Sequence, residues 1–482
     1  MSGPAARGMA AGAPHGAWPR GGPAPLPDRP ARLALRILSA DDVGRIHTAA
    51  IERLGADGAA AVAAARSAPS RFTLAGRAPG HEVPLGARRL WLAAGAGSAG
   101  EGGRAQHVRL RTGGAPVLAT AADLDAACAL ADALPEVAVV AGPPVHAAGE
   151  TPLAELARCF AGTSKHVLPG TLATAAEGEA AVAMATAVAG SAAELRRRPP
   201  LSWCGDADAL PAALVCARAG LPVALAMPPG TVAEPGSAAV AEAAPGAAER
   251  HAAPPDVAAA LVRHHAAVLA ACAAVQAAVP GAPFLRVAGP ALAGLPASGP
   301  SAVAFTLAAI QLAALVGLPV IAVGFATASH EPDWQACTEG AFAALAATAA
   351  GADVTGGAGT LGAGTVFSPE QLVMDSEVFS WSARIAAGIV VEPETLAVEA
   401  AREVGIGGNY LSQGHTRRHL KDVWRPRLLD RSMWDAWRAG GREGAYEKAS
   451  ALIDRLAAHH EVVPLGDEVS GTLRRIVAEA GL

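Results

Sequence analysis

Short apolar stretches alternate with longer, Ala-rich helical patterns through the middle of the chain. Each short stretch is closed by Gly, Pro or a polar residue, as expected for parallel strands covered on both faces. Strict alternation of strand and helix predicts a parallel sheet, and the number of units favours closure into an α/β TIM barrel, the (β/α)8 fold. The seven predicted strands are Val137–Ala141, His166–Leu168, Leu201–Cys204, Pro222–Ala226, Pro283–Val287, Pro319–Val323 and Ala352–Thr355.

The eighth strand of such a barrel is less evident, and Thr365–Phe367 and Gly388–Val391 are the two candidates. A polar segment rich in Pro and Gly, Pro228–Pro255, interrupts the series. The helices predicted between the strands are Thr151–Ala161, Ala175–Ala189, Ala209–Ala219, Val257–Val279 and Ser301–Val316.

The N-terminal part of the chain has a different pattern. A helix is predicted to begin after Ser39, because Ser39 and Asp42 have the spacing of a capping box. From Phe72 to Leu118 the pieces FTLAG, EVPLG, RLWLAAG and HVRLRTGG predict small antiparallel strands. We therefore expect a disordered tail over residues 1–35, a helix and β subdomain over 36–135, the barrel over 136–392 and a helical extension over 393–482.

Composition excludes several classes of function. The formal net charge is -5, and the basic residues cluster only at Arg196–Arg198 and Arg417–Arg418, which argues against a nucleic-acid surface. No apolar run of about 18 residues is free of Gly, Pro or charge, so we expect no membrane span and a soluble, cytoplasmic protein. The six cysteines are widely spaced and predict buried, reduced thiols with no zinc site.

Two polar loops follow the last two predicted strands. The first loop carries His330, Glu331, Asp333, Trp334 and Gln335, and the second is rich in glycine. Because the carboxyl ends of parallel strands lie at one edge of a barrel, where such folds place their chemistry, we expect both loops at the functional face.

Several stretches of the chain, in order, resemble one known family, the trimethylamine methyltransferases. They are ILSADDVGRIHTAAIERLG, AGLPVALAMP, VPGAPFLRV, HEPDWQACTEG with AGADVTGGAG, SPEQLVMDSEV and GGNYLSQGHTRRHLKDVWRPRLLDR, across roughly residues 36–440. The resemblance implies a (β/α)8 barrel and a corrinoid-dependent methyltransferase, which moves a methyl group from an amine to the Co(I) of a separate corrinoid protein. It implies a corrinoid (cobalamin) carried by that partner and methyl transfer of the kind used in methanogenesis and one-carbon metabolism. Because the cysteines lack the spacing of a zinc site, we expect no metal bound by this chain.

Two departures from the family shape the expected substrate. The trimethylamine enzymes resembled here carry pyrrolysine in the helix before the last strand, whereas Glu339–Ala350 contains ordinary residues around Phe342. The chain therefore resembles the branch that demethylates quaternary amines such as glycine betaine. The altered segment Pro228–Pro255 keeps two alternatives open, namely trimethylamine demethylation and a barrel that binds methylamines without turnover. We also expect a homo-oligomer.

A quaternary amine suggests which residues of the first loop bind substrate. Aromatic faces bind such cations, often with a carboxylate nearby. Trp334 and Asp333, with Glu339, His330 and Gln335, are therefore the predicted substrate site. The competing interpretations are a Trp that covers the barrel, a carboxylate favoured by the helix dipole at Glu339 and an exposed His330.

Four further features each have two interpretations. Gly356, Gly357 and Gly359 either face the corrinoid or allow close backbone packing, and packing is the stronger explanation. Asp375 and Glu377 either face the barrel mouth or are solvated, with solvation favoured. His415 and His419, four apart, are weak metal ligands without a third partner. Trp434 and Trp437 are expected to pack a C-terminal helix on the barrel.

Overall fold

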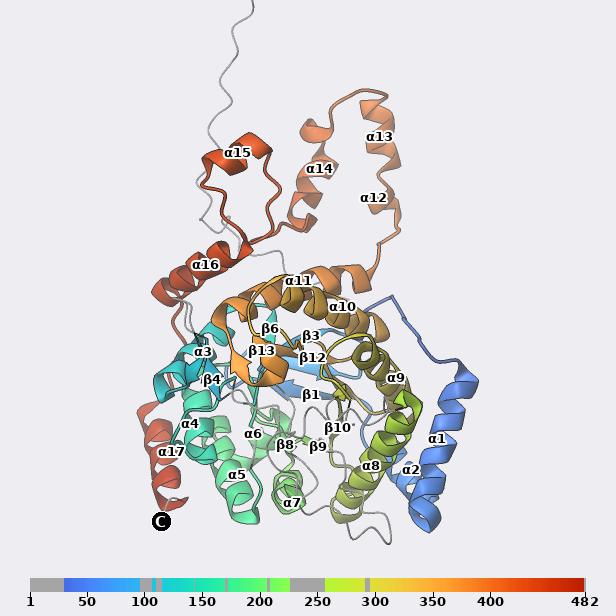
Figure 1. Cartoon of the computed structure of the whole chain (residues 1–482), viewed down its shortest axis with the longest axis vertical. Coiled ribbons are helices and arrows are strands. Elements are labelled where there is room, and N and C mark those ends of the chain that lie inside the picture. The colour runs from blue at the N-terminus through green and yellow to red at the C-terminus, as the bar shows by residue number, and fades with distance from the viewer. Residues whose placement is uncertain are drawn as a thin grey trace, which may run out of the picture.

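An eight-stranded parallel sheet forms the centre of the computed structural model, which describes residues 30–95, 106–109, 115–142, 144–169, 172–205, 209–225, 256–290 and 295–480 (Figure 1). The strand order is β7-β6-β3-β12-β11-β10-β9-β8, and every neighbouring pair in it is parallel. The strands are β3 (Trp91–Ala94), β6 (Val137–Ala141), β7 (His166–Leu168), β8 (Trp203–Gly205), β9 (Val223–Leu225), β10 (Phe284–Ala288), β11 (Val320–Val323) and β12 (Val354–Ala358).

The two ends of this sheet meet and close it. Val167 of β7 pairs with Leu201, just before β8, in a parallel bridge. Val167 N–H donates to the carbonyl of Pro200 at 3.0 Å, and Ser202 N–H donates to the carbonyl of Val167 at 3.1 Å. The predicted (β/α)8 barrel is thus confirmed.

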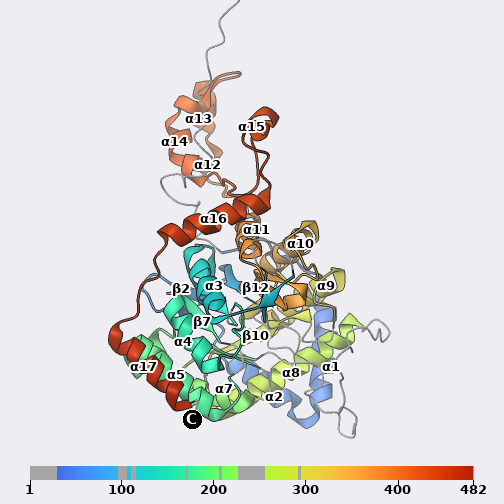
Figure 2. The same cartoon turned by 60° about the vertical axis from the view of Figure 1, so that its left-hand side comes forward.

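Helices follow the strands and surround the barrel (Figures 1 and 2). They are α3 (Ala121–Ala133), α4 (Pro152–Gly162), α5 (Ala175–Ala189) with α6 (Ala192–Arg197), α7 (Leu210–Ala219), α8 (Val257–Ala278), α9 (Pro300–Val316), α10 (Trp334–Ala350) and α11 (Pro369–Ala387). Threonine capping boxes fix the starts of α3 and α5, and left-handed glycines end α5, α7, α9 and α10. These local signals explain why the observed helix bounds lie close to the bounds predicted from the sequence.

The first barrel strand is one that the sequence analysis placed elsewhere. β3 was expected in an antiparallel subdomain, but it pairs in parallel with β6 and β12 and fills the eighth position. Neither candidate for the eighth strand is correct: 388–391 has no strand, and β14 (Val366–Phe367) belongs to another sheet. β3 was overlooked because its loop holds β4 (His107–Val108) and β5 (Val117–Leu118), which separate the strand from its helix.

A hairpin fills the amino end of the barrel. β1 (Phe72–Ala75) and β2 (Glu82–Leu85) pair antiparallel, as predicted for this part of the chain. Leu74, Val83 and Leu85 are buried together with inward-facing residues of the barrel strands, such as Val139 and Leu285. The hairpin therefore completes the apolar core at this end.

A small second sheet covers part of the carboxyl end of the barrel. Its order is β13-β14-β4-β5, where β13 is Thr360–Leu361. β4 and β5 come from the loop after the first barrel strand, and β13 and β14 come from the loop after the last one. These two loops are therefore joined over the barrel edge where the sequence predicts function.

The ends of the chain lie along the outside of the barrel. Residues 31–35 run beside α10 and α11 through backbone hydrogen bonds to Ala349 and Ala386, so the predicted tail is anchored at its last residues. The rest of that tail, and the segment 228–255, lie outside the described residues. α1 (Ala40–Leu54) begins at the predicted Ser39–Asp42 capping box and is followed by α2 (Gly58–Ser67), while α16 (Ala445–His459) packs on α11 and α17 (Asp467–Ala480) packs on α4 and α5.

Between α11 and α16, short helices project away from the barrel (Figures 1 and 2). They are α12 (Pro393–Leu396), α13 (Val398–Val404), α14 (Gly414–His419) and α15 (Trp434–Ala439). Trp434 is 66% exposed and contacts Trp437 at a ring-centroid distance of 5.1 Å. The expected packing of these tryptophans on the barrel is therefore wrong, since α15 carries no buried residue.

Helix α8 is, among the described residues, long and apolar enough to cross a membrane. More than half of its most apolar stretch is buried inside the protein, however. Its His264 and His265 each contact the buried guanidinium of Arg286 at 2.9 Å. This packing is that of a core helix.

Candidate functional site

The two polar loops follow β11 and β12 at the carboxyl edge of the barrel and lie against each other. Gly362 N–H donates to the carbonyl of Ser329, and Ala363 N–H donates to the carbonyl of Thr327, each at 2.7 Å. The imidazole of His330 is exposed and lies beside Gly362. The loop after β11 and the loop after β12 therefore form one rim.

An ion pair extends this rim to the small sheet. The guanidinium of Arg109, just after β4, pairs with the carboxylate of Glu331. Arg109 is largely buried, whereas the Glu331 side chain is about half exposed. This arginine was not singled out from the sequence, because only the fold brings residue 109 next to the first loop.

Asp333 caps helix α10. Its Oδ1 accepts hydrogen bonds from Ala336 N–H at 3.0 Å and from Ser329 Oγ at 2.9 Å. The backbone hydrogen bond from Ala336 is the main cause that lowers the pKa of Asp333. Its carboxylate therefore has a structural role at the start of α10, whatever else it contacts.

Trp334 is the first residue of α10, and its side chain points largely into solvent. It is 80% exposed, which is more than any other aromatic side chain among the described residues. Gln335 beside it is also exposed, and its Nε2 donates to Glu339 Oε1 at 3.2 Å. The structure thus brings Gln335 and Glu339 together and leaves the ring of Trp334 open, so its contact with a cation stays a prediction.

Glu339 is the best-positioned carboxylate of the predicted substrate site. Its Oε2 accepts from Thr327 Oγ1 at 2.6 Å and from Ala328 N–H at 2.9 Å. Burial raises the pKa of Glu339, but hydrogen bonds from Thr327, Ala328, Gln335 and Ser298 outweigh it, and the pKa lies below its usual value. The side chain is therefore ionised at neutral pH and holds a fixed negative charge at the rim.

A narrow cleft lies on one side of Glu339, between the start of α9 and the middle of α10. Its lining is mostly small and apolar, with Ser298, Thr306 and Glu339 as the polar groups. The space measures about 10 Å³, roughly enough for one water molecule. A quaternary amine is larger than this, so an amine that contacts Glu339 needs the open side of the carboxylate or a movement of the loop.

The glycines predicted to face the corrinoid are buried. Gly356 and Gly357 lie within β12 and not in a loop, which corrects their assignment. At Gly359, whose φ is +85°, a Cβ would lie 2.8 Å from the ring of Phe367 and 2.9 Å from Leu372. Close packing therefore explains Gly359, and contact of the three glycines with a corrinoid stays a prediction.

Asp375 and Glu377 of α11 are both buried, so the expectation that they are solvated is wrong. Asp375 Oδ2 accepts from Gly359 N–H at 2.8 Å, and its Oδ1 accepts from Gln371 Nε2 at 2.7 Å. Burial raises the pKa of Asp375 to about 7. The carboxyl group thus supports the glycine turn after β12 from beneath, and Glu377 holds the backbone near Leu428.

Comparison with known proteins fits this architecture. A sequence model of the family described as trimethylamine methyltransferase (MTTB) matches residues 48–480, which include the barrel, the rim and the C-terminal helices. The chain belongs to this family. The resemblance carried by the sequence motifs is therefore confirmed.

Individual proteins similar to this chain match different shares of it. The trimethylamine methyltransferase MttB of Desulfitobacterium hafniense is 29% identical over 438 residues, which are 86% of this chain and 82% of the relative. The trimethylamine methyltransferase MttB of Methanosarcina barkeri is 34% identical over 225 residues, 46% of each chain. A glycine betaine methyltransferase of Desulfitobacterium hafniense is 29% identical over 235 residues, 47% of this chain and 49% of the relative. The matches to these last two proteins span about half of their length.

Proposed function

We propose that this family member transfers a methyl group from a quaternary methylamine, of the glycine betaine type, to the Co(I) of a separate corrinoid protein. The carbon–nitrogen bond breaks, its electron pair stays on nitrogen, and a neutral tertiary amine leaves. The methyl group is bound to cobalt, which is formally oxidised to Co(III). The observation that carries the proposal is the family match over residues 48–480.

The names of the relatives support the substrate class. They are named for trimethylamine or for glycine betaine, and both are methylated amines. Between the two, the ordinary residues of α10 favour the quaternary amine, because the trimethylamine enzymes that the sequence resembles carry pyrrolysine in this helix. A quaternary nitrogen already bears its positive charge, so its departure as a neutral amine needs no acid.

The rim of the barrel supplies the charge for binding such a cation. Glu339 is held ionised by its hydrogen bonds, and the exposed ring of Trp334 starts the same helix. Carboxylates and aromatic faces are the groups that bind quaternary ammonium ions in proteins. We place the amine on the solvent-facing side of Glu339, because the cleft on the other side is too small for it.

The cysteines agree with a reducing location. All six cysteines are reduced thiols, and five of them are buried. Reduced thiols persist in the cytoplasm. The Co(I) state of a corrinoid requires the same reducing conditions. We therefore place the protein in the cytoplasm.

The experiment is a panel of amines mixed with the full chain and a reduced corrinoid protein, followed by visible spectroscopy. We expect glycine betaine, carnitine or proline betaine to convert the Co(I) spectrum into that of methyl–Co(III), and trimethylamine to leave it unchanged. Conversion with trimethylamine alone would favour trimethylamine demethylation. Amine binding by calorimetry without any spectral change would favour a barrel that binds methylamines without turnover.

A further inference from the structure

The helices that project from the barrel have no hydrophobic core of their own. We call residues 389–423 the arm; α12, α13 and α14 within it carry no buried residue. Large apolar side chains of the arm are exposed instead, among them Ile389, Leu396, Ile406 and Leu411. A segment without a core needs another source of stability, such as a bound metal or a covering partner.

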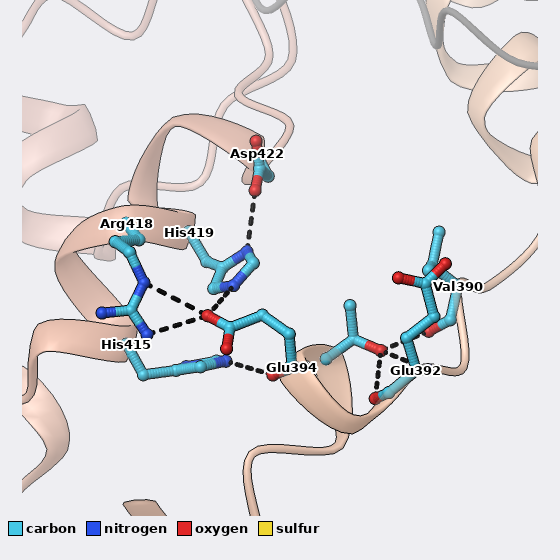
Figure 3. Close-up of polar contacts among 8 residues, drawn as sticks. Val390, Glu392, Glu394, His415, Arg418, His419 and Asp422 are labelled. Carbon is cyan, nitrogen blue, oxygen red and sulfur yellow. Dashed lines mark hydrogen bonds and ion pairs between the residues drawn. The ribbon is translucent and has the colours of Figure 1, made fainter.

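Three metal-ligating side chains meet inside this arm (Figure 3). One ligand atom each of Glu394 in α12 and of His415 and His419 in α14 lie within 4.8 Å of one another. The two histidines are four residues apart on one helix, and their ring centroids are 4.4 Å apart. Two imidazoles and a carboxylate form the protein ligand set of many zinc sites. The third ligand that the sequence did not reveal comes from a helix about 20 residues earlier in the chain.

Each ring nitrogen of His419 faces a carboxylate. Its Nδ1 lies 2.9 Å from Asp422 Oδ2, and its Nε2 lies 3.4 Å from Glu394 Oε1 (Figure 3). A carboxylate on the far nitrogen is the usual partner of a metal-bound histidine.

Arg418 does not fill the position. Its Nε and Nη2 donate to Glu394 Oε1 at 3.1 and 2.8 Å, so among the described contacts Oε2 is left as an acceptor. Metal-bound carboxylates are commonly hydrogen-bonded in this way on their other oxygen. His415 Nε2 contacts the carbonyl of Glu394 at 2.8 Å and would exchange this contact for the metal. Ligand atoms around tetrahedral zinc lie about 3.3 Å apart, so the proposed site requires exposed Glu394 and the two partly buried histidines to move closer by rotation of their side chains.

We propose that Glu394, His415 and His419 bind a divalent cation of the zinc class, with Asp422 orienting His419 and water in the fourth position. The ion links α12 to α14 across 25 residues and holds the arm in place of a core. The site lies outside the barrel, so the inference does not depend on the proposed methyl transfer. It also replaces the expectation from the sequence that the chain binds no metal.

The test uses the untagged full chain, stripped with EDTA and titrated with Zn²⁺ by calorimetry, with Co²⁺ as a spectroscopic probe. We expect one ion per chain, intense visible bands of tetrahedral Co²⁺, and slower tryptic cleavage at Arg402 and Arg417 when Zn²⁺ is bound. Glu394→Gln and His415→Ala should each weaken binding by at least about a hundredfold, and Asp422→Asn by about tenfold. His459→Ala changes an exposed histidine outside the cluster and should bind Zn²⁺ like the parent.

Two results would overturn the site. One is a parent chain that binds Zn²⁺ no more tightly than a Glu394→Gln/His415→Ala double variant. The other is that the Glu394→Gln and His415→Ala single variants both bind Zn²⁺ as tightly as the parent. Because the arm carries no buried side chain in α12 or α14, these variants should fold, and an unchanged thermal unfolding of the barrel verifies it.

Discussion

Replacing Trp334 by alanine removes the exposed aromatic ring at the start of α10. The ring is 80% exposed, so a cation over its face is still partly hydrated. Such contacts contribute about 0.5–1 kcal/mol, compared with about 2 kcal/mol when the cation is desolvated. At about 1.4 kcal/mol per factor of ten, Trp334→Ala should weaken binding of a quaternary amine by about two- to fivefold in the free chain. A thirtyfold loss would require the ring to become covered on binding.

The assay is isothermal titration of glycine betaine, carnitine and proline betaine into parent and variants. Trp334→Phe should retain most of the affinity, because it keeps an aromatic face. Phe342→Ala is the matched control: Phe342 lies on the same helix and is 68% exposed, but it is two turns away from the rim. Its loss should leave the affinity unchanged.

The reasoning fails in two ways that the titration separates. If Trp334→Ala binds each amine as tightly as the parent, the ring has no part in the site. If Phe342→Ala weakens binding as much as Trp334→Ala, the effect comes from α10 as a whole and not from a cation contact.

Three further predictions concern carboxylates. Glu339→Gln should lower amine affinity at low salt and much less at high salt, because it removes a charge while keeping the shape, and titrations at two ionic strengths check this. Glu377→Gln should lower the free energy of unfolding by about 3 kcal/mol, since the buried carboxylate accepts backbone hydrogen bonds from Arg427, Leu428 and Leu429. Urea unfolding measures this loss. The control is Glu399→Gln, which changes an exposed carboxylate and should leave the free energy of unfolding unchanged. Asp375 has a pKa of about 7 in the folded chain, above its usual value. Between about pH 4 and pH 7 the folded chain therefore binds more protons than the unfolded chain. The contribution of Asp375 to stability consequently falls as the pH rises through this window. Asp375→Asn should lack this slope; parallel slopes in parent and variant would contradict the assignment.

Much of the barrel could be predicted from the sequence, because the patterns that mark its strands and helix starts are local. Seven strands were recognised as short apolar runs between capped helices, and the capping residues Ser39, Thr120 and Thr174 fix three helix starts. The place of β3 in the barrel was missed, because its sequence pattern resembles that of a small antiparallel strand. Its actual position depends on parallel pairing with β6 and β12, which are distant in the sequence. Local pattern cannot supply such long-range pairing.

The candidate site shows the same division. That the loops after β11 and β12 share one edge follows from strand order, and Gly362 and Ser329 do meet. The pairing of Arg109 with Glu331, and the burial of Asp375, depend on loops crossing the barrel edge and could not be read from spacing. The third partner of His415 and His419 likewise became visible only when α12 was placed beside α14.

The central claim is methyl transfer from a quaternary amine, and a single-turnover reaction with methyl-deuterated glycine betaine tests it most directly. The full chain, a Co(I) corrinoid protein and the labelled amine are mixed, and mass spectrometry follows both products. The proposal predicts one deuterated methyl group on the corrinoid for each dimethylglycine formed. Labelled glycine betaine recovered intact beside an unmethylated, still reduced corrinoid protein, under conditions where the amine is bound, would contradict it.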